Sequence, residues 1–570
     1  MSWQQQQQPQ QPQHGYVGSN ELLMGNQQHY NQQYNNNNNP QYNQQQQYNN
    51  QSPYASNQYQ QPQQPYAPQQ AFQAPYTANA ATNGAPKPYN PVPPPNPPTI
   101  VSKPKYNDVW ATALFAVFMA GFVGLAVLGV PMTLDSLRDG SSANSKPTNA
   151  KNGASYSVGL SAADIGGLVA ASVGTGVAFS VLYFFLMLNF PGPLIKFSYF
   201  FNVVMMAAFA AYMGYVRSWI ACGIFALFAV LLAVSYWGIR SRIPFSQIVL
   251  ETVCKISGRL NGTLFVALGG MIVSAAFSVV WLATLLGMAE WVSQKNLASG
   301  VMYAILVLLV FMNFWFNEVV RNTIHSAVCG TFATYYFMGM QQPNSDTITL
   351  PSNHTTAKSL GRALTTSFGS ICFGSLLVSL IRTLKFIAQM AKNDSAQDGN
   401  ILCCIIATCF ECILACLADI LDYFNKYAYT EIAIYGKSYC EGGKDAWNLF
   451  KYKGIDLIIN DVLIGYVLGM GSFISAILCA FAGFLFVYLK GGLGTLGNGP
   501  GVYAGVCLIS AFIGMWLFLV LLEVIDSGTA ATFVCLAEDP ATIQRQQPRF
   551  FESIQQRFPD VNWGMQSIAY

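Results

Sequence analysis

Charge is what this sequence has least of. Lys, Arg, Asp and Glu make up 9% of its 570 residues and apolar residues make up 52%, whereas a soluble domain averages about 25% charged residues. Length alone would suggest three or four soluble domains, but this composition excludes that interpretation. The net charge of +3 is too small to indicate a nucleic-acid partner.

Several short motifs are also missing, and each absence excludes a class of protein. There is no Walker A motif, which argues against an ATP-driven pump on this chain, and no HExxH or G-x-S-x-G motif of a hydrolase. The glycine-rich piece at 493–497 does not follow a strand and is no dinucleotide fingerprint. We therefore expect no enzyme, no cofactor and no metal site. The sequence also lacks a secretory signal peptide, so the first apolar span is expected to direct insertion and leave the N-terminus in the cytosol.

The thirteen cysteines are not spaced as a disulfide framework. Five of them share one apolar run, namely Cys403, Cys404, Cys409, Cys412 and Cys416. Their spacing is reminiscent of a metal site, but no His lies among them, and a helix in lipid rarely binds zinc. Cysteine also behaves as a small apolar residue, so we favour packing between helices.

Residues 1–105 form a low-complexity tail. Its first 100 residues carry only two charged side chains, Glu21 and Lys87, among Gln, Asn, Tyr and Pro. Such a segment cannot bury enough surface to offset its ordering entropy, so disorder is predicted. The composition is prion-like and favours self-association. A regulatory or clustering tail and a tolerated, functionless tail both remain open, and PVPPPNPP at 91–98 is either an SH3 or WW ligand or a linker.

The chain becomes strongly apolar from Val109 onward. A transmembrane helix needs roughly 20 apolar residues. The predicted spans are 109–131, 164–190, 193–216, 219–238, 262–289, 300–340, 364–388, 401–423, 462–488 and 500–526. We therefore predict an all-α polytopic membrane protein with about ten transmembrane helices, in which 106–540 form the transmembrane domain and 541–570 a cytosolic tail. The sixth span is long for a single crossing, so a polar interruption or bend is expected from Asn317 to His325.

The distribution of Lys and Arg predicts the orientation. These residues are more frequent in 239–261, 341–363 and 424–461 than in the alternate loops, which places both termini in the cytosol. The segment 424–461 mixes charges and aromatics in a way that suits helices on the membrane surface. In this topology the sequon at Asn393 lies outside and is a candidate glycosylation site.

Three stretches resemble the choline-transporter-like family, and specifically its fungal pH-nine-sensitive branch. They are WFNEVVRNTIHSAVCGTFATYYF at 315–337, DILDYFNKYAYTEIAIYGKSYCEGGKDAWNLF at 419–450 and EVIDSGTAATFVCLAED at 523–539. The resemblance covers about residues 105–560. It implies about ten transmembrane helices, cytosolic termini and solute movement across the plasma membrane or an organelle membrane. In animal members the solute is choline or a related amine; the loop at 132–163 is shorter than theirs.

Acidic residues inside spans are costly and are candidates for function. A quaternary ammonium also needs aromatic faces, because it cannot donate a hydrogen bond. The candidate substrate-binding residues are Trp315, Glu318, His325, Glu411, Glu523 and Asp526, and Asp419 is a further acid in a span.

Four of these candidates also have a structural interpretation. Glu318 could form an ion pair with Arg321 three residues along the helix. His325 could relay protons or be a buried histidine with its hydrogen bonds satisfied. Glu523 and Asp526 could be interfacial carboxylates.

Three functions are consistent with these features. The first is a plasma-membrane transporter of choline or a related small organic cation, facilitated or coupled to a gradient without ATP hydrolysis. The second is a non-transporting membrane organiser or sensor that acts through the tail. The third is a lipid-handling protein such as a scramblase. The partners expected are the lipid bilayer and a small solute.

Overall fold

The computed structural model describes residues 105–143, 162–295, 299–342, 348–397, 401–492 and 499–557. Nearly all of these residues are helical, and one short antiparallel pair joins β1 (Met340–Gln341) to β2 (Ile348–Thr349). The predicted disordered tail lies outside the described residues, apart from Lys105 at its end.

Ten described helices are long and apolar enough to cross a membrane. They are α2 (Val109–Ala143), α3 (Ala162–Asn189), α4 (Pro191–Tyr215), α5 (Trp219–Ile239), α7 (Gly262–Gln294), α8 (Ser299–Met338), α10 (Phe368–Gln397), α11 (Ile401–Tyr435), α12 (Tyr439–Lys490) and α13 (Pro500–Glu538). The prediction of an all-α protein with ten transmembrane helices is confirmed. The cytosolic placement of the termini stays a prediction.

Four shorter helices accompany the spans: α6 (Ile243–Arg259), α9 (Thr355–Leu364), α14 (Pro540–Gln546) and α15 (Pro548–Arg557). The segments 239–261 and 341–363 are therefore not plain loops. One face of α6 is fully buried at Val249, Leu250 and Val253, which anchors this helix against the bundle. The predicted C-terminal tail begins with α14 and α15.

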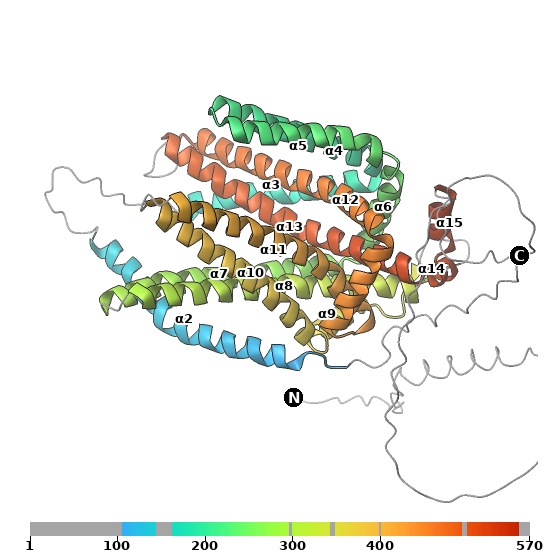
Figure 1. Ribbon diagram of the computed structural model, residues 1–570, viewed down its shortest axis with the longest axis horizontal. Helices are drawn as coiled ribbons and strands as arrows, with labels where there is room; N and C mark the ends of the chain where they lie inside the picture. Colours follow the sequence, from blue (N-terminus) through green and yellow to red (C-terminus); the bar gives the residue numbers. More distant parts are fainter. Residues whose placement is uncertain are drawn as a thin grey trace, which may run out of the picture. The chain divides into compact units, whose positions relative to one another are not determined.

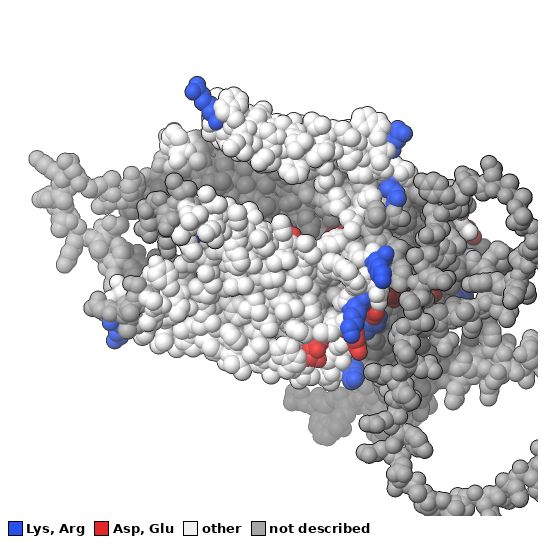
Figure 2. All heavy atoms as spheres, viewed as in Figure 1, with Lys and Arg blue, Asp and Glu red and all other residues white. Residues whose placement is uncertain are grey.

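The long helices run side by side, with α4 and α5 at one edge and α2 at the opposite edge (Figure 1). On the face seen in Figure 2 the flanks of the helices are almost free of charge, and the Lys, Arg, Asp and Glu side chains lie mainly toward the helix ends. This distribution is expected where helix flanks face lipid and helix ends face water. Within the bundle, α8 contacts α7, α10, α11 and α13, so its side chains meet several neighbouring helices.

Helix α8 continues without interruption through Asn317 and His325, whose side chains contact α7 and α13. A bend in this segment stays a prediction. The prediction of surface helices is wrong in its first part. The segment 424–435 does not form a surface helix but continues α11 with Tyr427 and Ile432 buried. The residues from Tyr439 onward form the first part of α12, ahead of its apolar span.

The cysteines of α11 also differ from expectation. Cys403, Cys409, Cys412 and Cys416 are exposed on this helix, whereas Cys372 is buried. The four therefore lie on its outer surface instead of packing between helices. Apolar character alone does not distinguish these positions, because in a membrane both the outside and the inside of a bundle are apolar.

The backbones of α2 and α7 approach each other closely at Gly129 and Gly287. A Cβ atom built on Gly287 would overlap the carbonyl group of Gly129, and one built on Gly129 would lie 2.7 Å from the carbonyl oxygen of Thr284. Small residues at such crossings let helices in lipid pack tightly. We expect Gly287→Ala to separate α2 from α7 and to destabilise the protein by about 1–3 kcal/mol.

Thermal unfolding of the detergent-solubilised protein measures this effect. Gly269→Ala on the same helix is the matched control, because a Cβ atom there meets nothing within 4 Å. Equal unfolding midpoints for the two variants would show that the crossing tolerates a methyl group.

Candidate functional site

Four charged side chains from three helices meet inside the bundle. We call Glu318 and Arg321 of α8, Arg382 of α10 and Asp422 of α11 the arginine cluster. Arg321 Nη2 lies 3.1 Å from Glu318 Oε2 and 3.8 Å from Asp422 Oδ1. Arg382 pairs with Glu318 through Nη1, and its Nη2 lies 2.6 Å from Asp422 Oδ2. Each arginine therefore contacts both carboxylates.

The carboxylate of Glu318 is the best buried member of the arginine cluster, with 3% of the residue exposed. The amide of Asn322 lies 3.4 Å from Glu318 Oε2 and donates a 2.9 Å hydrogen bond to Ser375 on α10. The ion pair with Arg321 predicted as the structural alternative is confirmed, but it is only part of the network. The sequence analysis did not predict Arg382 as a residue of this site, although it lies inside the predicted span 364–388, where a basic residue is as costly as an acidic one.

A second group lies along α11 toward one end of the bundle. We call Lys426 of α11, Asp461 of α12 and Asp526 of α13 the lysine cluster. The Lys426 ammonium lies 2.8 Å from Asp461 Oδ1 and 2.7 Å from Asp526 Oδ1. Only 13% of the Lys426 side chain is exposed, so both carboxylates compensate a charge that is largely removed from water.

His325 connects α8 with α11 and α13 through hydrogen bonds. Its Nδ1 lies 2.9 Å from the Ser527 hydroxyl of α13, and its Nε2 lies 2.8 Å from the Lys426 carbonyl oxygen and 3.2 Å from the Thr430 hydroxyl. The residue is 4% exposed. His325 is thus a buried histidine with both ring nitrogens in hydrogen bonds, and it lies directly beside the backbone of Lys426.

Glu523 of α13 lies between the two clusters. Its Oε1 lies 3.4 Å from the Ser527 hydroxyl. It is also near enough to Arg321, Asp526 and Lys426 to interact with their charges. No ion pair within 4 Å joins Glu523 to another described residue, whereas the other four carboxylates of the site each pair with an arginine or a lysine.

Two sequence candidates lie apart from this site. Trp315 is fully buried, packs edge-on against Phe115 and Phe118 of α2, and donates its indole N–H to the Cys372 carbonyl oxygen at 3.1 Å. Glu411 pairs with Lys392 of α10 at 2.8 Å. Glu411 precedes Asp422 by eleven residues, or about 16 Å along a helix. The structure therefore brings together Glu318, His325, Glu523 and Asp526, but not Trp315 or Glu411.

The two clusters and Glu523 together contain more carboxylates than cationic side chains. The carboxylates are Glu318, Asp422, Asp461, Glu523 and Asp526, and the cations are Arg321, Arg382 and Lys426. Buried charge is costly unless it is compensated. With all groups ionised, two negative charges remain for a bound cation or for protons to neutralise.

The turn between α11 and α12 lies within 419–450, the second of the three stretches that resemble the family. Buried Glu431 pairs with Lys437 at 2.9 Å, and Lys437 also reaches Asp445 at 2.8 Å. Burial opposes the charge of Lys437, but Glu431 and Asp445 outweigh it and raise the pKa of Lys437. Gly436 supplies the left-handed turn with φ of 66°, and Ser438 begins α12 in a capping box.

The candidate glycosylation site lies at the last residue of the seventh span. Asn393 is exposed near the C-terminal end of α10. Whether it carries a glycan stays a prediction.

Loss of one arginine should leave two carboxylates of the arginine cluster poorly compensated. We expect Arg382→Gln to destabilise the protein by about 3 kcal/mol, the cost of removing one partner from a buried ion pair. Lys385→Gln on the same helix is the control, because Lys385 has no hydrogen bond or ion pair to any described residue. Thermal unfolding in detergent compares the two, and equal midpoints would contradict the role of the cluster.

Comparison with known proteins identifies the family to which this chain belongs. Residues 223–541 match the family model described as plasma-membrane choline transporter. Protein PNS1 of Gibberella zeae is 33% identical over 476 residues, covering 81% of this chain and 84% of the relative, and Protein PNS1 of Saccharomyces cerevisiae is 32% identical over 482 residues, covering 81% and 85%. A CTL-like protein of Dictyostelium discoideum is 31% identical over 459 residues, covering 80% and 76%. The chain therefore belongs to the choline-transporter-like family, and within it to the fungal pH-nine-sensitive branch.

Proposed function

We propose that this protein moves a small organic cation of the choline class across the plasma membrane. Movement is facilitated or coupled to an ion or proton gradient, without ATP hydrolysis. Family membership supports a transporter, and the observation that carries the choice of a cation is the excess of carboxylates over cations in the charged site. Ionisable groups inside a membrane domain commonly mark substrate or proton pathways.

Two charged side chains of the site, Arg321 and Asp526, are partly exposed, which supports a water-accessible path beside them. Arg321 has 45% of its side chain exposed and Asp526 has 32%, although both lie on membrane-spanning helices. Contact of these charges with hydrocarbon would be costly, so such groups normally face a bundle interior or a hydrated cavity. A cation that enters this space would meet Glu523 and Asp526 together.

Aromatic rings next to the lysine cluster suit an organic cation. The Lys426 ammonium lies 5.8 Å from the centroid of the Tyr427 ring. Tyr423 stands edge-on to Tyr427, with their ring centroids 5.5 Å apart. Cation–π contact is worth about 0.5–2 kcal/mol, and the Tyr427 ring already accommodates one positive charge. The same chemistry would hold a quaternary ammonium that displaces or approaches Lys426.

Uptake of labelled choline into proteoliposomes, with and without a pH gradient, tests the proposal. We expect saturable uptake that Glu523→Gln lowers about tenfold, because one charged contact worth about 1.4 kcal/mol is lost. Glu318→Ala should also weaken or abolish uptake. Glu411→Gln is the matched control and should retain uptake, because its ion pair with Lys392 lies away from the site.

Two results would contradict this function. Uptake no greater than that of empty liposomes, for choline and for other small organic cations, would remove the transporter proposal. Equal losses in Glu411→Gln and Glu523→Gln would show that the effect does not arise at the charged site. Lipid flipping in the same liposomes without added solute would instead favour a lipid-handling protein.

Deletion of residues 1–100 separates a transporter from an organiser. The deletion retains Asn107, whose side chain donates a 2.7 Å hydrogen bond to the Gly436 carbonyl oxygen, and so keeps the start of α2 attached to the bundle. We expect the truncated protein to retain full choline uptake in proteoliposomes. Loss of uptake by a truncated protein that unfolds at the same temperature as the full chain would assign the tail an essential role.

A further inference from the structure

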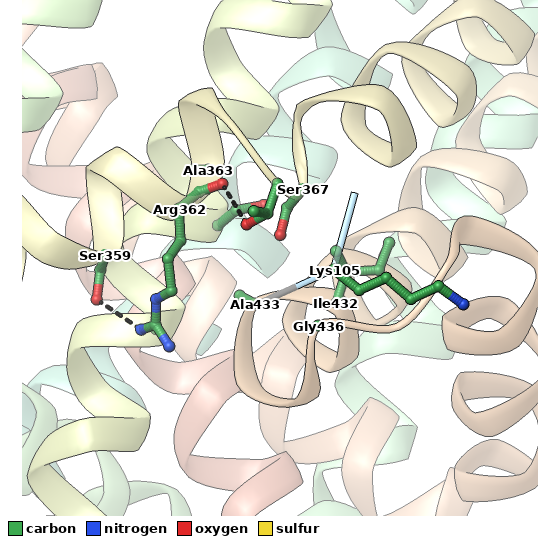
Figure 3. A pocket seen from close by; sticks show the side chains of 11 residues that line it. Lys105, Ser359, Arg362, Ala363, Ser367, Ile432, Ala433 and Gly436 are labelled. Carbon is green, nitrogen blue, oxygen red and sulfur yellow. Dashed lines mark hydrogen bonds between the residues drawn. The ribbon is translucent and has the colours of Figure 1, made fainter. Parts of the chain in front are cut away.

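A small pocket outside the charged site lies where α8, α9 and α11 meet the segment before α2 (Figure 3). Its cavity volume is about 20 Å³, which is room for about one water molecule. The lining includes Ser326 and Gly330 of α8, Ser359 and Arg362 of α9, and Lys105. Among the described residues that line this pocket none is acidic, and the charged side chains are Arg362 and Lys105.

Arg362 is partly buried without a carboxylate partner among the described residues. Its Nη2 donates a 3.1 Å hydrogen bond to the Ser359 hydroxyl, one turn earlier on the same helix (Figure 3). Burial lowers the pKa of the Arg362 guanidinium. The remaining N–H groups of the fork are therefore available to an acceptor that the described part of the chain does not supply.

The hydroxyl of Ser326 is a second polar group at this pocket, and it lacks a hydrogen-bond partner among the described residues. The residue is 2% exposed. Neighbouring hydroxyls of α8 behave differently, since Thr323 and Thr331 each donate to the carbonyl group four residues earlier at 2.7 Å. A buried polar group left without a partner costs about 1–3 kcal/mol, so the Ser326 hydroxyl at this pocket also requires an acceptor.

Gly330 preserves the space between these donors. A Cβ atom at this position would lie 3.2 Å from the Ser359 hydroxyl oxygen and 3.3 Å from Arg362 Nη2. A larger residue would therefore crowd the guanidinium against α8. The described lining of the pocket has donors on two walls and no acidic acceptor, which is the arrangement that a bound oxyanion requires.

We propose that this pocket binds a phosphate group, with one phosphate oxygen in the cavity and the others at its mouth. Arg362, Ser326 and Ser359 would donate hydrogen bonds to the anion, and an arginine fork suits phosphate oxygens in particular. Lys105 runs past Ile432 and Gly436 with its ammonium directed away from Arg362 (Figure 3). Because this side chain is long and exposed, it can turn to add positive charge at the mouth.

The position of the pocket allows two sources for the phosphate. It lies at the helix ends, where charged side chains gather near α9 (Figures 1 and 2), a level that suits a lipid headgroup as well as a soluble phosphate. The shared chemistry is a phosphate monoester or free phosphate. The two sources differ only in whether an acyl chain accompanies the anion, and an experiment can separate them.

Ligand-dependent thermal stabilisation of the purified full-length protein in detergent tests this proposal. The probes are inorganic phosphate, short-chain phosphatidic acid and, as a diester control, short-chain phosphatidylglycerol, each compared with sodium chloride at equal ionic strength. We expect phosphate or phosphatidic acid to stabilise the wild type and Lys358→Gln, which removes a charge on the same helix outside the pocket. Arg362→Gln should weaken binding at least tenfold, and the milder Ser326→Ala should weaken it about threefold.

The pattern of responses identifies the source. Stabilisation by phosphatidic acid alone assigns a membrane lipid, and stabilisation by inorganic phosphate alone or by both assigns recognition of the phosphate group itself. The proposal is overturned if sodium chloride or phosphatidylglycerol stabilises the protein equally. It is also overturned if both pocket variants, Arg362→Gln and Ser326→Ala, bind as tightly as Lys358→Gln.

Discussion

Ion pairs within the membrane-spanning helices are the interactions on which this bundle depends. In lipid, apolar side chains gain little from contact with one another, so specific association needs close packing and polar contacts between helices. Arg382 and Arg321 connect α8, α10 and α11 through Glu318 and Asp422, and Lys426 connects α11 with α12 and α13. Five helices are therefore held in register by charges that none of them could carry alone.

The need for polar contacts between helices also accounts for the positions of the three stretches that resemble the family. Residues 315–337 supply Glu318, Arg321 and His325, residues 419–450 supply Asp422 and Lys426, and residues 523–539 supply Glu523 and Asp526. Three segments that are far apart in the chain and resemble the family thus supply side chains that meet in space. A contact between two buried charges constrains both partners, whereas an apolar position facing lipid accepts many residues.

A network that stabilises the fold can also serve transport, because its charges are incompletely balanced. The two arginines neutralise Glu318 and Asp422, which makes the arginine cluster mainly structural. The lysine cluster and Glu523 retain the excess of carboxylate, beside the rings of Tyr423 and Tyr427. In the proposed function, the arginine cluster holds helices together and the neighbouring lysine cluster with Glu523 accepts the cation. His325 lies beside the lysine cluster through its contact with the Lys426 carbonyl oxygen.

The sequence by itself determined the class of protein, the number of spans and the family, because length and hydropathy are local properties that can be read along one dimension. It also marked Glu318, Glu523 and Asp526 as costly acids, and it found the pair of Glu318 with Arg321 because a helix places residues three apart on one face. Only the tertiary structure decided that Glu318 meets Arg382, that Trp315 packs against α2, that Glu411 pairs with Lys392, and that the cysteines of α11 face outward. Those outcomes depend on how each helix is rotated about its axis and which neighbour it meets, and hydropathy cannot reveal either one where lipid and protein interior are equally apolar.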